Sequence, residues 1–420
     1  MIRIGIIGVG TVGTSVAEIL ESNRDIICAR AGKEIVVKKG VVRDLSRQRT
    51  IDIPLTDNVD DVLDDPEIDI IVELMGGVEE PYAVVKKALQ NGKAVVTANK
   101  ALLAYHRYEL QEVAGELPFE FEASVAGGIP IIKALREGLS ANHIESIKGI
   151  INGTANYILT KMMNEGADFT PVLKEAQALG YAEADPTFDI GGFDAAHKLL
   201  ILASIAYGIE TKPEDILIEG IESVTQDDIS FAKEFGYTLK LLGIAKKVGD
   251  YVELRVHPAL VPQRQMIAKV DGVMNGISVI GDKVGETMYY GPGAGGDATA
   301  SAVISDIIAI ARGGKSSPML GFKRPLESGL VLLERDAVVT KYYLRLKVAD
   351  RPGVLAKVSQ VMGEQNISIE TMLQKPARGD AATLLLSTHA CKERAMQDAL
   401  KDLFRLDSVK ERPVMIRIED

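Results

Sequence analysis

The feature that most restricts the fold of this 420-residue chain is a glycine-rich turn near the N-terminus. A β-branched run over Ile2–Ile7 leads into the sequence GVGTVG at residues 8–13, and a helical pattern covers residues 11–21. A strand, a G-x-G-x-x-G turn and a helix at the start of a βαβ series are typical of dinucleotide-binding domains. This context favours a nucleotide site over a simple turn.

Each glycine of this turn is expected to have a separate task. Gly8 permits the tight bend, Gly10 lets the main chain approach a pyrophosphate, and Gly13 lets the helix pack close to the strand. The first N–H groups of the helix then face the phosphates, with the positive end of the helix dipole behind them. The predicted cofactor residues here are Gly8, Gly10, Thr11, Val12 and Gly13.

Short apolar runs alternate with amphipathic helices through the first third of the chain. Strands are expected at residues 2–7, 36–42, 68–73, 94–97 and 119–123, and helices at residues 11–21, 81–90 and 101–114. Near-continuous apolar strands separated by helices predict a parallel sheet that is covered on both faces. The predicted class is therefore α/β, with a Rossmann-type doubly wound parallel sheet. Residues 23–34 are interpreted as an insertion before the second strand.

The rest of the chain changes pattern twice. The middle third predicts an α+β substrate and dimerisation domain with a mixed sheet, and it ends in a glycine cluster that opens an apolar helix. The last eighty residues follow the order βαββαβ of a small, self-contained ferredoxin-like domain. The expected domains are residues 1–128 with 292–320 for the dinucleotide, 129–291 for the substrate, a linker over 321–340, and a C-terminal domain over 341–420.

Charge and cysteine content exclude several classes of function. The 48 Lys and Arg residues against 59 Asp and Glu residues give a net charge of −11, whereas nucleic acids and membrane surfaces attract a basic face. Cys28 and Cys391 predict no disulfide framework, and the histidines lack zinc-ligand spacing. No stretch has the pattern of a membrane span or a signal peptide. We expect a soluble cytoplasmic protein that binds neither nucleic acid nor membrane.

The end of the second strand bears on the choice of coenzyme. The dinucleotide fingerprint expects an acidic residue about twenty positions after the turn, for a ribose hydroxyl, but here the strand ends at Arg43 and Asp44. Arg43 suits a 2′-phosphate and favours NADP, whereas Asp44 suits the bare ribose of NAD. A solvated charge at a strand end is the alternative for Arg43. The sequence therefore prefers NADP and leaves NAD open.

The stretch most informative about chemistry is residues 180–198, a loop with four carboxylates that leads into a helix. Asp194 and Lys198 are four residues apart and share one helical face. An exposed ion pair is the ordinary interpretation, but residues 199–203 are apolar all round, as in a buried helix. We expect Lys198 to be a positioned proton donor, because burial favours loss of its proton and the carboxylate holds its geometry.

Two further segments follow predicted strands of the parallel sheet. Lys100 comes just after the strand at residues 94–97, at the carboxyl edge where such sheets bind ligands. The helix dipole disfavours a cation at a helix start, so a functional role gains weight over a chance position. Residues 122–130 follow the last strand. They are interpreted either as a crossover turn or, through a carboxylate and alternate main-chain carbonyls, as a site for a hard cation.

At these motifs the whole chain resembles the monofunctional homoserine dehydrogenases that carry a C-terminal ACT domain. The segments that carry the resemblance are residues 8–13, 97–100, 122–130, 152–159, 180–198 and 291–296. The long motif at residues 180–198 is highly specific. The resemblance implies reversible reduction of L-aspartate 4-semialdehyde to L-homoserine by NAD(P)H, in threonine, methionine and isoleucine synthesis.

The same resemblance implies roles for individual residues. Lys198 is similar to the acid/base residue that protonates the substrate oxygen, Glu183 to the ligand of the substrate amino group, and Lys100 to a residue at substrate and cofactor. The implied substrate residues are Gly180, Glu183, Asp189 and Asp194. The implied ligands of a monovalent cation, Na⁺ or K⁺, are Glu122, Val125, Gly127 and Ile129. Gly295 and Gly296 of the late glycine cluster are implied at the cofactor.

The C-terminal segment resembles an ACT domain through residues 348–355 and 366–369. In that family a turn before the first helix binds an amino acid, usually where two such domains meet. The implied effector is L-threonine as a feedback inhibitor, and the alternative is a structural or dimerising appendage. The implied regulatory residues are Asp350, Gly353, Val354, Leu355, Asn366 and Ile367.

Two rival functions have different requirements. An aldehyde dehydrogenase that oxidises the same semialdehyde needs a cysteine nucleophile, and neither Cys28 nor Cys391 lies at a predicted site. A non-catalytic amino-acid or nucleotide sensor would need neither Lys198 nor Asp194. We therefore expect a dehydrogenase that acts on L-homoserine and L-aspartate 4-semialdehyde, and a homodimer or homotetramer formed through the mixed sheet.

Overall fold

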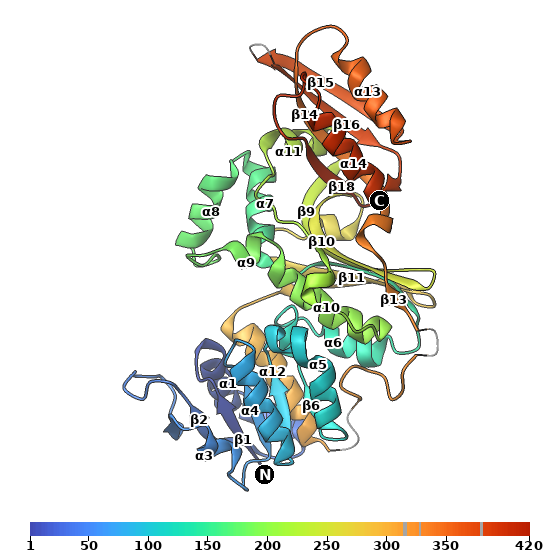
Figure 1. Cartoon of the computed structure of the whole chain (residues 1–420). Coiled ribbons are helices and arrows are strands. Elements are labelled where there is room, and N and C mark those ends of the chain that lie inside the picture. The colour runs from blue at the N-terminus through green and yellow to red at the C-terminus, as the bar shows by residue number, and fades with distance from the viewer. Residues whose placement is uncertain (314–316, 327–328, 379–380) are drawn as a thin grey trace. The chain divides into compact units, whose positions relative to one another are not determined.

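The structure, a computed structural model, describes residues 1–313, 317–326, 329–378 and 381–420. The chain forms two compact units. Unit 1 comprises Met1–Gly153, Asp194–Asp215 and Val273–Leu330, and unit 2 comprises Thr154–Phe193, Ile216–Gly272 and Val331–Asp420. Figure 1 labels helices and strands of both units. Among the described residues, no helix combines the length and apolarity that a membrane crossing needs.

Unit 1 contains a six-stranded parallel sheet in the order β3-β2-β1-β4-β5-β6. Its strands are β1 (Ile2–Ile7), β2 (Ile35–Val41), β3 (Leu55–Thr56), β4 (Ile70–Glu73), β5 (Ala94–Thr97) and β6 (Phe119–Glu120). Its helices are α1 (Thr11–Ser22), α2 (Arg24–Ala31), α3 (Asp60–Leu63), α4 (Glu79–Gln90) and α5 (Lys100–Ala114). This strand order is that of a doubly wound dinucleotide-binding sheet, which confirms the predicted fold class.

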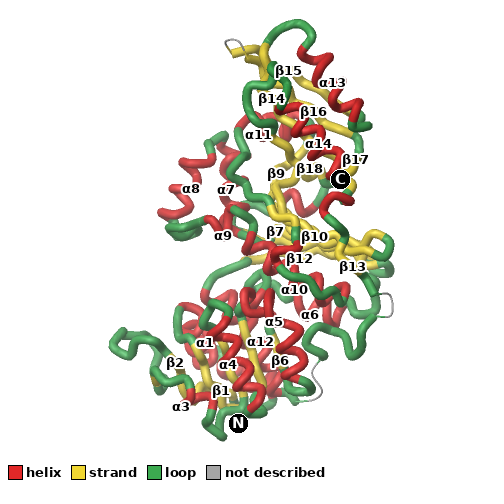
Figure 2. The backbone as a smooth tube through the Cα atoms, in the orientation of Figure 1, coloured by secondary structure: helices red, strands yellow, loops and turns green. Residues whose placement is uncertain are grey.

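A helix from much later in the sequence completes the cover of this sheet. Helix α12 (Gly296–Ala311) packs against α1, and Val303 and Ile307 share one apolar core with Val16. A Cβ atom at Gly296 would lie only 2.7 Å from the Oγ of Ser15, so α12 approaches α1 closely here and a larger residue would require the Ser15 side chain to move. In Figure 2 the helices of this unit lie beside the strands of the parallel sheet.

The remainder of unit 1 is an antiparallel group of strands with a buried helix. Strand β11 (Met274–Gly281) pairs with β7 (Ile144–Ile150) on one side and β12 (Gly285–Pro292) on the other. Helix α6 (Ile131–Lys133) is followed by one π-helical turn. In helix α10 (Phe193–Tyr207) every residue from Asp194 to Ile205 is buried, which confirms the expectation of a buried helix after the carboxylate-rich loop.

Unit 2 joins the C-terminal domain to part of the middle region through one sheet. Its first elements are α7 (Gly153–Glu165), α8 (Phe169–Ala178), α9 (Thr187–Ile190), β8 (Leu217–Ile218), α11 (Gln226–Glu234), β9 (Tyr237–Val248), β10 (Tyr251–Pro262) and β13 (Val331–Leu332). The C-terminal elements are β14 (Val339–Ala349), α13 (Val354–Glu364), β15 (Ile369–Arg378), β16 (Ala381–Thr388), β17 (Cys391–Lys392), α14 (Glu393–Phe404) and β18 (Val414–Ile418). The predicted βαββαβ order is confirmed.

The sequence-based expectations for single elements differ from the structure at three places described here. Residues 23–34 are mostly the helix α2, whose Ile27 and Ala31 enter the core of the parallel sheet, so they are not a simple insertion. The strand expected at residues 119–123 ends at Glu120, because the Glu122 amide donates to the buried Asp306 and the chain turns. Strand β12 was not expected.

The C-terminal domain is also less separate than its sequence pattern indicates. Strand β18 pairs with β14 inside the domain and with β10 outside it, so the two sheets are continuous. Within the expected linker, 321–340, Val331–Leu332 pairs with β10 and Arg335–Ala337 forms a 3₁₀ turn. Residues 327–328 of that linker lie outside the described residues. The linker segment is therefore partly built into the sheet.

Candidate functional site

The glycine-rich turn leaves the space that a dinucleotide needs. Gly8 has a φ of 101°, and a Cβ atom there would lie 2.6 Å from the carbonyl oxygen of Leu74. A Cβ at Gly13 would lie 2.6 Å from the Gly8 oxygen, whereas nothing lies within 4 Å of one at Gly10. Among the residues that the structure describes, no side chain caps the N-terminus of α1, so its first amides remain available to phosphate. These residues fit a dinucleotide.

Arg43 and Asp44, which follow β2, differ in how accessible they are to a coenzyme. The side chain of Arg43 is 85% exposed and its nearest carboxylate partner, Glu80, is 3.5 Å away and itself exposed. The Asp44 carboxylate accepts hydrogen bonds from the amide (2.9 Å) and hydroxyl (2.6 Å) of Ser46, which lower the pKa of Asp44. Arg43 is thus accessible to a phosphate, while Asp44 is engaged by its own turn.

The structure brings Lys100, Asp194 and Lys198 together. The Lys198 Nζ donates to Asp194 Oδ2 at 2.8 Å and to the main-chain oxygen of Ile151 at 2.8 Å. The Lys100 Nζ lies 2.8 Å from the other oxygen of the same carboxylate, and Asn152 Nδ2 donates to Oδ2 at 2.8 Å. Lys198 and Asp194 are buried, whereas the Lys100 side chain is 36% exposed.

These contacts determine the charge of the cluster. Burial alone would raise the pKa of Asp194, but the ammonium groups of Lys198 and Lys100 outweigh it and hold that pKa well below its ordinary value. Asp194 is therefore ionised at neutral pH. One carboxylate balances one of two ammonium groups, so the protonated cluster carries a net positive charge.

A cavity of about 400 Å³ in unit 1 connects this cluster with the glycine-rich turn. Its wall includes Val12 of the turn, Lys100, and Lys198. Gly293 and Ala294, from the late glycine cluster, and Gly127 also line it. The predicted Gly295 and Gly296 are the next residues, at the start of α12, and Gly295 has a φ of 119°. The cavity can therefore receive both a dinucleotide end and a small substrate beside two ammonium groups.

A buried carboxylate next in sequence to the cavity-lining Leu74 was not predicted from the sequence. Glu73 ends β4 and is fully buried; its two oxygens accept from the Met75 amide (2.7 Å) and the Thr97 hydroxyl (2.6 Å). The Thr97 hydroxyl accepts from the Asn99 amide, and the Asn99 side chain caps α5 at Leu102. This chain of hydrogen bonds fixes the residue before Lys100. A carboxylate that closes an apolar strand was the signal available in the sequence.

The segment predicted to bind a cation is a buried turn. The Glu122 carboxylate accepts from the amides of Ile132 (2.7 Å) and Lys133 (2.9 Å), and burial together with the charge of Asp306 raises the pKa of Glu122 to about 7. Gly127 has a left-handed φ of 54°. Among the described residues, no three His, Cys, Asp or Glu side chains form a metal-binding group. The four residues implied as cation ligands, Glu122, Val125, Gly127 and Ile129, are all buried in this turn.

The residues implied for the substrate fall in both units. Asp194 belongs to unit 1, whereas Gly180, Glu183 and Asp189 belong to unit 2. Gly180 has a φ of 76° just after α8, Glu183 is exposed, and Asp189 lies in the single turn of α9. The contacts described within unit 1 join Asp194 to the two lysines.

The predicted regulatory residues surround the start of α13. Gly353 (φ 86°) and Asn366 (φ 54°) adopt left-handed conformations, at the N-cap of α13 and after its end. Asp350 and Leu355 are exposed. Val354 and Ile367 are buried in the domain core, so only their main chain could contact a ligand.

Comparisons with known proteins cover nearly the whole chain. A family model described as Homoserine dehydrogenase matches residues 130–308, one described as Homoserine dehydrogenase, NAD binding domain matches residues 8–121, and one described as ACT domain matches residues 342–408. The homoserine dehydrogenase of Helicobacter pylori is 57% identical over 420 residues, which are 100% of this chain and 99% of that protein.

Solved structures agree with these matches. The crystal structure of a homoserine dehydrogenase from Thiobacillus denitrificans superimposes with a TM-score of 0.92 at 47% identity, over 100% of this chain and 98% of that chain. A hyperthermophilic archaeal homoserine dehydrogenase in complex with NADPH has a TM-score of 0.62 at 30% identity, over 73% of this chain and 96% of that chain.

Proposed function

This chain belongs to the homoserine dehydrogenase family, is an oxidoreductase with a nicotinamide cofactor, and carries an ACT domain; we propose that Lys198 is its proton donor and acceptor. The reaction interconverts L-homoserine and L-aspartate 4-semialdehyde. The resemblance inferred from the sequence is thereby confirmed. The observation that carries the proposal is the position of Lys198 in the wall of the cavity that also reaches Val12.

The charge of the lysine cluster supports this role. As the aldehyde is reduced, negative charge builds on its oxygen, and an ammonium group both stabilises that charge and supplies a proton. In the reverse direction the neutral amine accepts the proton of the hydroxyl. The bonds of Lys198 to Asp194 and to the Ile151 oxygen hold the amine in one position. When bound, the nicotinamide supplies or accepts the hydride.

We propose that Lys100 provides the second positive charge beside Asp194. It is more exposed than Lys198 and lines the same cavity. We further propose that Gly180, Glu183 and Asp189 hold the substrate, because a zwitterion that leaves water needs a partner for each charge. Glu183 is the proposed acceptor of the substrate ammonium group.

The test of the function is a spectrophotometric assay. Purified protein with L-homoserine should increase absorbance at the wavelength of reduced nicotinamide in the presence of NADP or NAD, and L-serine, which is one carbon shorter, should react far more slowly. The same assay without enzyme, and with the enzyme but no L-homoserine, gives the background. If L-homoserine reduces neither NADP nor NAD in the presence of the enzyme, the proposal is refuted.

We propose NADP as the preferred coenzyme, on the accessible guanidinium of Arg43 and on the engagement of Asp44 by Ser46. The NADPH complex of the archaeal relative is consistent with this preference. Arg43 would contact the 2′-phosphate in a charge-assisted hydrogen bond. A ratio of kcat/KM for NADPH over NADH below one would contradict it.

We also propose a monovalent cation at the main-chain carbonyls of the segment from Glu122 to Ile129, and L-threonine as an inhibitor that binds at the turn before α13. The buried turn and the left-handed residues at Gly353 and Asn366 support these two proposals. Replacing K⁺ and Na⁺ with tetramethylammonium should lower the activity, since that ion is too large for carbonyl ligands. L-threonine should lower the activity or raise the melting temperature. If it changes neither the activity nor the melting temperature, L-threonine is not an effector of this protein.

A further inference from the structure

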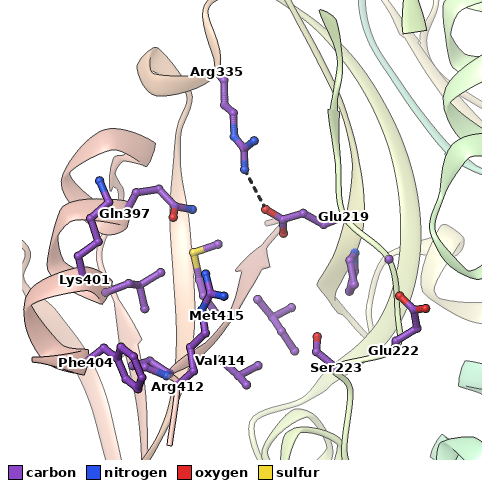
Figure 3. Close-up of a pocket in the computed structure, with 15 residues that line it drawn as sticks. Glu219, Glu222, Ser223, Arg335, Gln397, Lys401, Phe404, Arg412, Val414 and Met415 are labelled. Atoms are coloured by element: carbon purple, nitrogen blue, oxygen red, sulfur yellow. Dashed lines mark hydrogen bonds and ion pairs between the residues drawn. The ribbon is translucent and has the colours of Figure 1, made fainter. Parts of the chain in front are cut away.

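One buried guanidinium in unit 1 has no carboxylate among its described partners. Three other buried arginines each form an ion pair with a carboxylate, namely Arg136, Arg255 and Arg417. Even the exposed Arg335, which lines a cavity in unit 2, lies 3.4 Å from Glu219 (Figure 3). Arg107 is only 2% exposed, yet its described acceptors are one hydroxyl and two main-chain oxygens. A cation buried in this way costs free energy, which points to a role for its contacts.

The contacts of Arg107 join helix α5 to the end of helix α10. Its Nε donates to the Ser204 hydroxyl at 2.6 Å, and its Nη2 donates to the main-chain oxygen of Thr211 at 2.7 Å. The neighbouring Tyr108 adds a hydrogen bond from its hydroxyl to the main-chain oxygen of Ile209 at 2.7 Å. The guanidinium therefore lies at the C-terminal turn of α10, where the helix dipole favours a cation.

Arg107 and Lys100 lie on the same face of α5, because seven residues make almost two helical turns. Lys100 contacts Asp194 in the first turn of α10, and Arg107 contacts Ser204 in its last turn. At 1.5 Å per residue, the two contacts are about 10 Å apart along α5 and about 15 Å apart along α10. Two contacts with this separation determine the angle between the helices as well as the distance between them.

From this geometry we propose that Arg107 is a positioning residue for the reaction, which holds α5 against α10 so that the Lys100 ammonium stays at the second oxygen of Asp194. The inference rests on the proposed function, in which that ammonium provides a positive charge beside the reacting oxygen. Arg107 itself does not line the cavity. When its contacts to Ser204 and Thr211 are lost, α5 is free to shift along α10 and the Lys100–Asp194 contact of 2.8 Å lengthens. A displacement of about 1 Å in an active site can cost about 10²-fold in rate.

A double-mutant cycle tests the proposal. The kcat of L-homoserine oxidation is measured at saturating substrate and coenzyme in the unaltered chain, in Arg107→Met, in Lys100→Met and in the double variant. Arg107→Met should lower kcat about tenfold or more. In the Lys100→Met background the same change should lower kcat less than about twofold, because the group that Arg107 positions is absent. Residues about 10 Å apart that share no described partner normally act additively, so a merely structural role of Arg107 would lower kcat equally in both backgrounds.

Two variants serve as controls and one as a milder test. Lys93→Met removes a buried cation whose described acceptors, the main-chain oxygens of Asp65 and Ile68, lie outside α5 and α10, and it should keep its kcat. Arg335→Met removes a guanidinium of unit 2 and should also keep its kcat. Ser204→Ala removes only the acceptor of Nε, so it should fold and lower kcat about threefold, with no effect in the Lys100→Met background. Urea unfolding shows which variants are folded in the assay.

An equal loss of kcat in both backgrounds overturns the proposal, and so does a kcat of Arg107→Met within about twofold of that of Lys93→Met. If Arg107→Met does not fold, the cycle with Ser204→Ala decides by the same criterion. Failure of the proposed function gives a different result, because the unaltered chain then oxidises no L-homoserine with either coenzyme. If the unaltered chain is active and Lys100→Met keeps its kcat, the role of Arg107 through Lys100 is overturned, while the dehydrogenase activity stands.

Discussion

Replacement of Lys198 by methionine removes the proposed proton donor and keeps the shape of the site. Methionine has an unbranched side chain of similar length, so it can occupy the same place in the buried helix α10 without an ammonium group. Proton transfer by a positioned side chain contributes about 10²- to 10⁴-fold to a rate. We therefore expect kcat to fall by about 10²- to 10⁴-fold, which corresponds to a barrier increase of about 3–5 kcal/mol.

The expected loss of stability is smaller than for an ordinary buried ion pair. Breaking such a pair costs about 3–5 kcal/mol because it leaves an unbalanced buried charge. In Lys198→Met the Asp194 carboxylate keeps the Lys100 ammonium at 2.8 Å and the Asn152 amide at 2.8 Å. The free energy of unfolding should therefore fall by less than about 3 kcal/mol. The variant should still fold, so its kcat can be measured.

Lys93 provides a matched control. It is also buried, its Nζ donates to the main-chain oxygens of Asp65 and Ile68, and it does not line the cavity. Lys93→Met should lose stability and keep its turnover. Initial rates of L-homoserine oxidation and urea unfolding of both variants give the comparison. A Lys198→Met enzyme whose kcat stays within about tenfold of that of Lys93→Met would refute the assignment, because the smallest expected effect is about 10²-fold.

Three further predictions concern neighbouring groups. Burial favours neutral Asp194, but the two lysines dominate and lower the pKa of Asp194. The stabilisation from these ion pairs is therefore present above the ordinary aspartate pKa and is lost as the pH falls through the folded-state pKa. In urea unfolding, the difference in unfolding free energy between the unaltered chain and Asp194→Asn should narrow below about pH 4. Arg43→Ala should lower kcat/KM about tenfold for NADPH, and far less for NADH, in steady-state assays. Thr97→Val should lower the unfolding free energy by about 1–3 kcal/mol, because it removes a donor to buried Glu73, and it should raise the KM or lower kcat through Lys100. Thr97→Ser keeps the hydroxyl and should restore both the stability and the kinetics. Equal effects of the Val and Ser variants would contradict the role of the hydroxyl.

Local patterns explain which parts of the fold were predictable. The turn at residues 8–13 and the burial of α10 follow from glycine spacing and from a run of apolar residues, and both depend on neighbours in the sequence. Helix α2 and strand β12 have weaker patterns, because Ile27 and Ala31 are the only residues of α2 that are buried, and Gly291 is the only buried residue of β12. Their conformation depends on partners that lie far away in the chain.

Pairing between distant strands was not predictable for the same reason. The parallel pairing of β18 with β10 joins Arg417 to Ala259, and no periodicity in either strand encodes that choice. The hydrogen bonds of Glu73 depend on Thr97, a residue of the adjacent strand. A sequence pattern identifies Glu73 only as a polar end of an apolar strand, and its partner becomes known when the strand order is known.

The active cluster shows how long-range assembly creates a chemical property that no single segment has. Lys100 begins α5, Ile151 follows β7, and Asp194 and Lys198 lie on α10. The i, i+4 pair on α10 would by itself be neutral. The contact of Lys100 with the second oxygen of Asp194 adds a positive charge, which would stabilise an alkoxide. The Ile151 oxygen accepts a hydrogen bond from the Lys198 amine, and Lys198 lines the cavity. The sequence therefore predicts the residue that we propose as proton donor, and the tertiary structure supplies the electrostatic field around it.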